Sequence, residues 1–274
     1  MQNLLFIFTF IFNPFHLQPQ ALKTGGKKPG KTKKTSGKLT KKEKKNVYGG
    51  THWRIQTPSK GPIHVWVPKN YNRKRAGTVF YIHGYHTTAD KTWDNDKLGL
   101  QFRKSRQNAI FIVPEAPGSR NEAVVWESLR ALKRTILKSN IRLPNGPTIV
   151  IGHSGAFRTI SRWSANKLLA QIILLDAMYG AHKVWDDFIG TGKKARHHKL
   201  VILGKDTADK GRAFAKKFPF AVIRKNMPAR YEKFTKRQKR AKLLLIRSQY
   251  SHMSIVTSQS VIPVLLRLTP LKLL

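Results

Sequence analysis

Residues 148–158, with the sequence TIVIGHSGAFR, decide the fold and direct attention to one serine. A short apolar run of β type leads into Gly152-x-Ser154-x-Ala156 and then into a helix-compatible sequence. Small residues around a serine permit a sharp strand-to-helix turn that exposes its hydroxyl as a nucleophile. The last position is usually glycine, and Ala156 is a mild departure because alanine also fits where a helix packs closely on a sheet. The alternative is an ordinary strand followed by a serine-capped helix, which the rest of the chain has to test.

Apolar segments of strand length recur on both sides of this turn. Residues 63–67 alternate apolar and polar side chains, and continuous apolar runs follow at 78–82, 109–113, 148–151, 171–175, 199–203 and 243–246. Helix-compatible stretches separate them at 98–105, 124–137, 157–168, 209–217 and 256–268. Apolar strands that alternate with helices predict an α/β fold with a mainly parallel sheet and helices on both faces.

Polar residues follow these predicted strands at the points where functional groups gather in such a sheet, the carboxyl ends. In chain order they are His83-Gly84-Tyr85, Gly152 to Gly155, Asp176, Asp206 and His252. The chain has only 13 acidic residues, so an aspartate after each of two strands indicates selection for that place. Serine, then aspartate, then histidine is one of the chain orders in which a catalytic triad occurs.

Each of these groups has a place in acyl-transfer chemistry. A serine hydroxyl needs a neighbouring base to take its proton, and we assign this role to His252 for Ser154. A buried carboxylate then fixes the imidazole tautomer and stabilises the imidazolium. The tetrahedral oxyanion needs two donors, for which the backbone N–H groups of Tyr85 and Gly155 are the candidates.

With these residues identified, the chain from about residue 48 to 274 resembles the α/β-hydrolase superfamily. The resemblance rests on His83-Gly84, the motif around Ser154, a strand-end aspartate and the late His252. More narrowly, GHSGAFR followed by LLDAMYG (174–180) is similar to a group of uncharacterised bacterial serine hydrolases or esterases. The resemblance implies an α/β-hydrolase fold and hydrolysis of an ester or amide through a Ser-His-Asp triad and an acyl-enzyme, without a cofactor; it does not identify the substrate.

The acid of the triad has more than one candidate. Most members of the superfamily place it after the strand that here ends at Gly204, which favours Asp206 or Asp209. A minority place it one strand earlier, which favours Asp176. Asp176 follows its apolar run without a gap, as a buried carboxylate would, whereas Asp206 directly follows Lys205 and suits a solvated loop. We therefore favour Asp176 and keep Asp206 as the alternative.

The first 46 residues differ from the rest in composition. Residues 1–21 include LLFIFTFIF, which is too short to span a bilayer but typical of the apolar part of a signal peptide. We expect export to the periplasm or the exterior, with a cytoplasmic location as the alternative. Residues 22–46 contain eleven lysines and predict a disordered arm. A formal P-loop match at 25–32 lacks the flanking strand and helix, so we interpret it as accidental. The globular domain is expected at 47–274.

The charge predicts an anionic partner. The formal net charge is +40, and outside the arm 42 basic residues still face 12 acidic ones. Such a balance favours attraction to cell-wall polymer, lipid headgroups or nucleic acid. A polyanion-binding protein on an inactive hydrolase scaffold is therefore the alternative function. The chain has no cysteine, which excludes disulfides and thiolate metal sites.

Several other residues have less specific interpretations. His83-x-x-His86 and His197-His198 lack a third ligand at a suitable spacing, so no metal site is expected. We expect a structural role for His153 and a surface position for Arg158, whose alternative is contact with an anionic substrate. Two groups of residues could line or cover a site: Trp93, Asp94 and Asp96 in one loop, and the segments 120–126 and 218–242.

Overall fold

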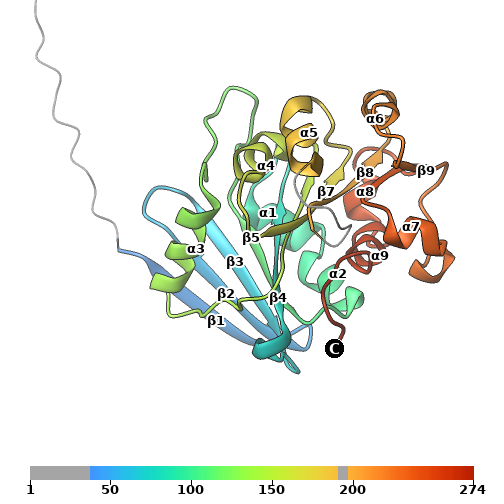
Figure 1. The fold of residues 1–274 in the computed structure, drawn as a ribbon. Coiled ribbons are helices and arrows are strands. Elements are labelled where there is room, and N and C mark those ends of the chain that lie inside the picture. The colour runs from blue at the N-terminus through green and yellow to red at the C-terminus, as the bar shows by residue number, and fades with distance from the viewer. Residues whose placement is uncertain (1–37, 191–196) are drawn as a thin grey trace, which may run out of the picture. The chain divides into compact units, whose positions relative to one another are not determined.

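The computed structural model describes residues 38–190 and 197–274, which form one sheet with helices on both faces (Figure 1). The predicted export segment and the P-loop match lie outside the described residues. The strands are β1 (Thr40–Val47), β2 (Gly50–Gln56), β3 (Pro62–Pro68), β4 (Gly77–Ile82), β5 (Ala109–Pro114), β6 (Thr148–His153), β7 (Leu169–Leu175), β8 (Lys199–Gly204), β9 (Val222–Arg224) and β10 (Leu243–Arg247). The helices are α1 (Ala89–Asn95), α2 (Leu98–Ser105), α3 (Leu129–Lys138), α4 (Phe157–Trp163), α5 (His182–Gly190), α6 (Ala208–Lys216), α7 (Lys236–Arg240), α8 (Ser254–Thr257) and α9 (Val261–Leu266).

The strand order of the sheet is β1-β2-β3-β5-β4-β6-β7-β8-β10-β9. Strands β1, β2 and β3 pair antiparallel, β3 joins β5 antiparallel, and every later pairing is parallel. The continuous apolar runs became the parallel strands because helices bury both of their faces. The prediction of a mainly parallel sheet flanked by helices is confirmed.

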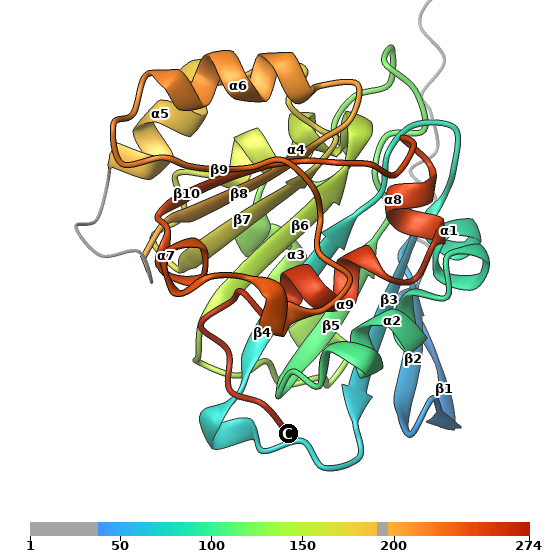
Figure 2. The ribbon, with the colours of Figure 1, turned by 90° about the vertical axis from the view of Figure 1, so that its right-hand side faces the viewer.

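Two apolar layers enclose the sheet. One contains side chains of α3, α4, α5 and α6, including Trp163 and Trp185. The other contains side chains of α1, α2, α8 and α9, including Trp93 and Phe102. In Figure 2, α2 and α9 lie in front of the sheet, and α3 and α4 lie behind it. The parallel strands therefore run through the centre of the core, and their carboxyl ends reach the surface at one edge.

Local hydrogen bonds explain where the helices differ from the predicted ranges. The side chain of Ser128 accepts from the N–H of Ala131 and caps α3, which starts later than 124. After α4, the Asn166 side chain accepts from the N–H of Leu168 and forms a turn, so the helix does not reach 168. The predicted helix 256–268 is split into α8 and α9 at Gln259, whose φ of 58° is left-handed.

The predicted boundary between arm and domain is wrong. Residues 40–46, which we placed in the disordered arm, form most of β1 and pair with β2. Their side chains are exposed, but backbone pairing and a 2.8 Å hydrogen bond from Trp53 Nε1 to Glu43 Oε2 hold the strand. The lysine-rich composition predicted disorder, but this edge strand is ordered by its backbone hydrogen bonds to β2. Among the helices of the described residues, none is long and apolar enough to cross a membrane.

Candidate active site

Ser154 lies at a sharp turn between β6 and α4. Its φ of 53° is in the left-handed region, and residues Ser154–Ala156 form a 3-10 turn that leads into the helix. A Cβ atom on Gly152 would lie 2.5 Å from Ile160 Cδ1 and 2.7 Å from Ala156 Cβ. Only glycine fits at 152, because the helix returns so closely over the end of the strand, and the methyl group of Ala156 fits at the other position. The geometry is that of a strained turn that presents a serine.

Asp176 is fully buried at the carboxyl end of the neighbouring strand β7. Its carboxylate accepts hydrogen bonds from the backbone N–H groups of Lys205, Asp206 and Thr207 at 2.9, 3.1 and 2.9 Å and from Thr207 Oγ1 at 2.8 Å. Burial opposes ionisation, but these bonds and the one from His252 outweigh it and hold the pKa of Asp176 well below its ordinary value. The carboxylate is therefore charged and fixed in orientation.

His252 follows β10 and faces this carboxylate. Its Nδ1 donates to Asp176 Oδ2 at 2.7 Å, and this bond raises the pKa of His252 above its ordinary value. The neutral ring then carries its proton on Nδ1 and leaves Nε2 free to accept one. The alternative acid, Asp206, is more than half exposed, and its Oδ2 lies 3.7 Å from the same nitrogen. The structure thus places both aspartates near His252, and Asp176 makes the hydrogen bond.

His153 connects this pair to the serine turn. Its ring centroid lies 4.4 Å from that of His252, and its Nε2 is 3.0 Å from the backbone carbonyl of His252. Burial lowers the pKa of His153 to about 4, so the ring is neutral at pH 7 and donates to that carbonyl. Since His153 directly precedes Ser154, it holds the histidine loop beside the serine, in agreement with the structural role expected for it.

The loop after β4 lies against the serine turn from the other side. A Cβ on Gly84 would lie 2.9 Å from Ser154 Cβ, and one on Gly155 would lie 2.5 Å from Tyr85 Cε1. Buried His83 fixes this loop through its Nδ1, 2.7 Å from the Gly84 carbonyl, and its Nε2, 2.9 Å from a carboxylate oxygen of Glu115. The two predicted oxyanion residues, Tyr85 and Gly155, are thus in contact, next to Ser154.

Arg158 has contacts that its sequence context did not predict. Its guanidinium donates to three carbonyls of the loop 119–122, those of Ser119, Arg120 and Glu122, at 3.3, 2.8 and 2.8 Å, and to Tyr85 Oη at 3.3 Å. The expectation of an ordinary surface arginine is wrong, because the side chain joins this loop to the loop that contains Tyr85. The sequence offered one indication of this role: Arg158 lies one turn into the helix after Ser154, and residues 114–123 have no predicted helix or strand.

Asp176, Asp206 and His252 also carry atoms of the kind that bind metal ions. Within residues 38–190 and 197–274, ligand atoms of Asp176, Asp206 and His252 lie within 4.8 Å of one another. Both oxygens of Asp176 already accept hydrogen bonds, and the facing nitrogen of His252 donates one of them. The arrangement fits a hydrogen-bonded pair better than a ligand set.

Two of the other candidate residues lie at a separate cavity. Trp93 stacks on the rings of His52 and His64, at 4.4 and 5.0 Å between centroids, and with Asp94 it lines a cavity of about 490 Å³ on the β1–β3 side. Asp96 is buried, which raises its pKa to about 6. The lysine-rich strand β1 supplies Lys42 and Lys44 to the same cavity.

The mainly parallel sheet carries a serine turn after β6, an aspartate after β7 and a histidine after β10, which is the chain order of these residue types in α/β-hydrolases. No protein-family model and no curated protein matches the sequence. Among solved structures, an S-formylglutathione hydrolase from Agrobacterium tumefaciens is 12% identical with a TM-score of 0.41 and covers 79% of this chain and 94% of its own. A feruloyl esterase module from Clostridium thermocellum, complexed with sinapinate, is 12% identical with a TM-score of 0.48 and covers 83% and 87%. An esterase from Pyrobaculum calidifontis is 10% identical with a TM-score of 0.45 and covers 84% and 82%. These values are too low to transfer an activity, so the functional assignment depends on the geometry of the site.

Proposed function

We propose that the chain is a serine hydrolase of the esterase, lipase or peptidase type, with Ser154, His252 and Asp176 as its triad. The observation that carries the proposal is the 2.7 Å hydrogen bond between His252 Nδ1 and the buried, five-fold hydrogen-bonded carboxylate of Asp176. A charged carboxylate in this place gives the imidazole one tautomer, with Nε2 as the base. The strained turn at Ser154, packed against His153 and the Tyr85 loop, supplies the nucleophile.

In the first half of the reaction, Ser154 Oγ attacks the substrate carbonyl carbon while His252 Nε2 takes the hydroxyl proton. The carbonyl π pair moves to oxygen, and the N–H groups of Tyr85 and Gly155 stabilise the oxyanion. When the tetrahedral intermediate collapses, the bond to the leaving alcohol or amine breaks and the imidazolium donates its proton to that group. Water then attacks the acyl-enzyme, again with His252 as the base, and releases the acid and free Ser154.

Covalent labelling tests this proposal. A fluorophosphonate probe should label the wild-type protein and not Ser154→Ala. Ser161→Ala is the matched control, because this half-buried serine lies on α4 and only its hydroxyl bond to the Arg158 carbonyl is lost. Failure of the folded wild type to react, or label that persists in Ser154→Ala, would exclude Ser154 as the nucleophile.

The substrate class follows from a separate measurement. A panel of acyl esters of increasing chain length, assayed beside aminoacyl amides, distinguishes esterase, lipase and peptidase activity. The hydrogen-bonded Asp176–His252 pair gives no support to an inactive scaffold as the alternative. Export and retention on an anionic surface stay predictions, since residues 1–37 lie outside the part of the chain that the structure describes.

A further inference from the structure

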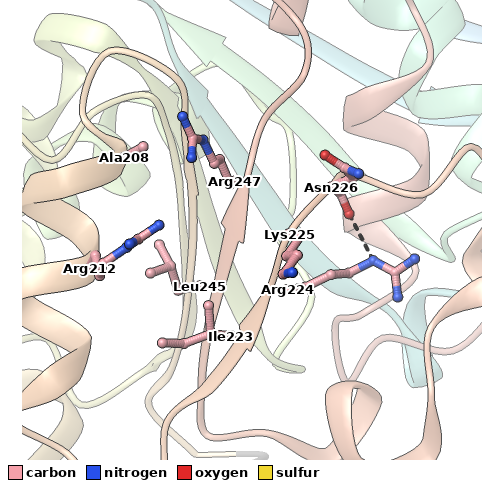
Figure 3. A pocket seen from close by; sticks show the side chains of 8 residues that line it. All are labelled: Ala208, Arg212, Ile223, Arg224, Lys225, Asn226, Leu245 and Arg247. Carbon is pink, nitrogen blue, oxygen red and sulfur yellow. Dashed lines mark hydrogen bonds between the residues drawn. The ribbon is translucent and has the colours of Figure 1, made fainter.

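A second cavity, of about 430 Å³, lies between α6, the edge strand β9 and the neighbouring strand β10 (Figure 3). Its lining residues are Ala208, Arg212, Ile223, Arg224, Lys225, Asn226, Leu245 and Arg247. Four of these eight side chains are cationic and none is acidic. The cavity is separate from the residues assigned to hydrolysis, and its ligand does not depend on that assignment.

The walls of this cavity follow from the pairing of β9 with β10 and from the helix that covers them. Leu245 pairs with Ile223 across β10 and β9, and side chains two residues apart on a strand share a face. Arg247 therefore shares a face of β10 with Leu245, and Lys225 directly follows the last residue of β9, so two cations border the cavity beyond the apolar pair. Helix α6 covers the other side, where a Cβ on Gly211 would lie 2.9 Å from Leu245 Cδ1, and the next residue, Arg212, borders the cavity.

Arg224 has a structural role and contributes little to a ligand site. Its guanidinium donates to the Asn226 carbonyl, the Lys233 carbonyl and Gln238 Oε1 at 2.8, 3.3 and 2.9 Å. It also lies 5.5 Å from the ring centre of Phe234. In Figure 3 this side chain turns away from Arg212 and Arg247 toward Asn226.

The other three cations differ from Arg224. Within the described ranges, Arg212, Lys225 and Arg247 make no side-chain hydrogen bond, ion pair or ring contact, and all three are exposed. Asp209 lies one turn before Arg212 on α6 and forms no ion pair with it in the described part of the chain. Three uncompensated positive charges around one small cavity produce a field that attracts a compact anion of more than one charge.

The floor of the cavity is apolar. Ile223 is 53% exposed although it lies on a strand beside the buried Leu245. An exposed isoleucine framed by three cations matches a ligand that combines an anionic group with an apolar portion. Guanidinium groups pair two N–H donors with the oxygens of either a carboxylate or a phosphate, but a phosphate has a third acceptor oxygen and a higher charge with which to engage three cations.

We propose that this cavity binds a phosphate ester, with the phosphate on Arg212, Lys225 and Arg247 and the apolar portion on Ile223 and Leu245. A soluble ester and the headgroup of phosphatidic acid share this chemistry. Phenyl phosphate is the probe for the first, and vesicles that contain phosphatidic acid are the probe for the second. Inorganic phosphate measures the anionic contribution alone.

Calorimetric titration of the full-length protein tests the site through Arg212→Gln/Arg247→Gln. This double variant should bind phenyl phosphate at least about tenfold more weakly, since each arginine provides charge-assisted hydrogen bonds. Arg130→Gln/Arg134→Gln on α3 is the matched control, because both arginines are exposed and the net charge changes equally. Ile223→Asn should weaken phenyl phosphate and leave inorganic phosphate unchanged. The melting temperature of each variant verifies its fold, and Lys225→Gln replaces the double variant if the latter unfolds.

The possible outcomes distinguish binding at this cavity from non-specific attraction of anions to a basic protein. Loss of binding in the α6–β10 variant but not in the α3 control supports the site. Vesicle binding that follows the same pattern, tighter than that of phenyl phosphate, identifies the lipid headgroup as the source. Equal weakening in the two double variants, or no binding of phenyl phosphate to the wild type at about 10 mM and low salt, would overturn the proposal.

Discussion

Replacement of Asp176 by asparagine tests whether Asp176, and not its neighbour Asp206, is the acid of the proposed triad. The carboxylate accepts five hydrogen bonds, whereas an asparagine offers one oxygen and one NH₂ group. The NH₂ group would face donors of either the 205–207 loop or His252. Asp206→Asn is the matched control, since it removes the same charge from a side chain that is 56% exposed.

The expected loss of activity differs by orders of magnitude between the two variants. Without the carboxylate at 2.7 Å, His252 loses its preferred tautomer and the stabilisation of its imidazolium. Loss of the acid in a serine triad lowers kcat by about 10⁴-fold. For Asp206, an exposed carboxylate 3.7 Å from the ring contributes roughly 0–1 kcal/mol, which corresponds to at most about a fivefold effect.

Stability should change in the same order and with a defined pH dependence. Removal of one partner from a buried charged network costs about 3–5 kcal/mol of unfolding free energy. The folded pKa of Asp176 lies below its unfolded value of 3.8, so its ionised contribution is present above that value and is lost as the pH falls toward the folded pKa. Urea titrations should therefore show a large difference between wild type and Asp176→Asn at pH 7 that shrinks on acidification.

Ester hydrolysis and the rate of fluorophosphonate labelling are the assays for activity. The expected result is a severe loss in Asp176→Asn and a minor one in Asp206→Asn, with both proteins folded. An equal or larger loss in Asp206→Asn would refute the reasoning from hydrogen-bond geometry and assign the acid to the strand that ends at Gly204.

Three further predictions concern the base, the serine turn and a buried lysine. In the wild type, kcat/KM should rise with pH along a limb centred above 6.5, because the bond to Asp176 raises the pKa of His252; in Asp176→Asn this limb should move to lower pH. Gly152→Ala should lower the unfolding free energy by about 1–3 kcal/mol and impair hydrolysis, because its Cβ would lie 2.5 Å from a methyl group of the core. As the control, Ala156→Gly should lower the unfolding free energy by at most about 1 kcal/mol and stay active. A well-folded and fully active Gly152→Ala variant would contradict the close packing of α4. Burial lowers the pKa of Lys199 to about 8 from 10.5, so the unfolded chain binds more protons in that window and stability should rise with pH across it; Lys199→Met should lack this rise in urea titrations at pH 8 and 10.

Sequence patterns predicted the centre of the molecule better than its margins. Each continuous apolar run became a parallel strand, because a strand buried on both faces has to be apolar throughout. The edge strands β1 and β9 escaped prediction, since the lysines of β1 have no apolar face and β9 has three residues. These two strands are ordered by backbone pairing with β2 and β10, which local sequence patterns do not reveal.

The same division applies to the site. Ser154 and Asp176 were visible because each directly follows a strand, and His252 because it lies in the loop after β10; the topology alone brings such strand ends together. Four of the five hydrogen bonds on Asp176 come from the 205–207 loop, whose course no local pattern specifies. The contacts of Arg158 with residues 119–122 are likewise tertiary, so its function became apparent only in three dimensions.

The two borders of the sheet also bear on how the protein behaves at high concentration. An unpaired strand edge is a template for pairing with a second chain, which leads to aggregation. Here one border is β1, with Lys41, Lys42, Lys44 and Lys45 exposed along it, and the other is the short strand β9, followed by Lys225. A second copy that added at either border would bring like charges together, so we expect these lysines to disfavour pairing between the strand edges of two copies.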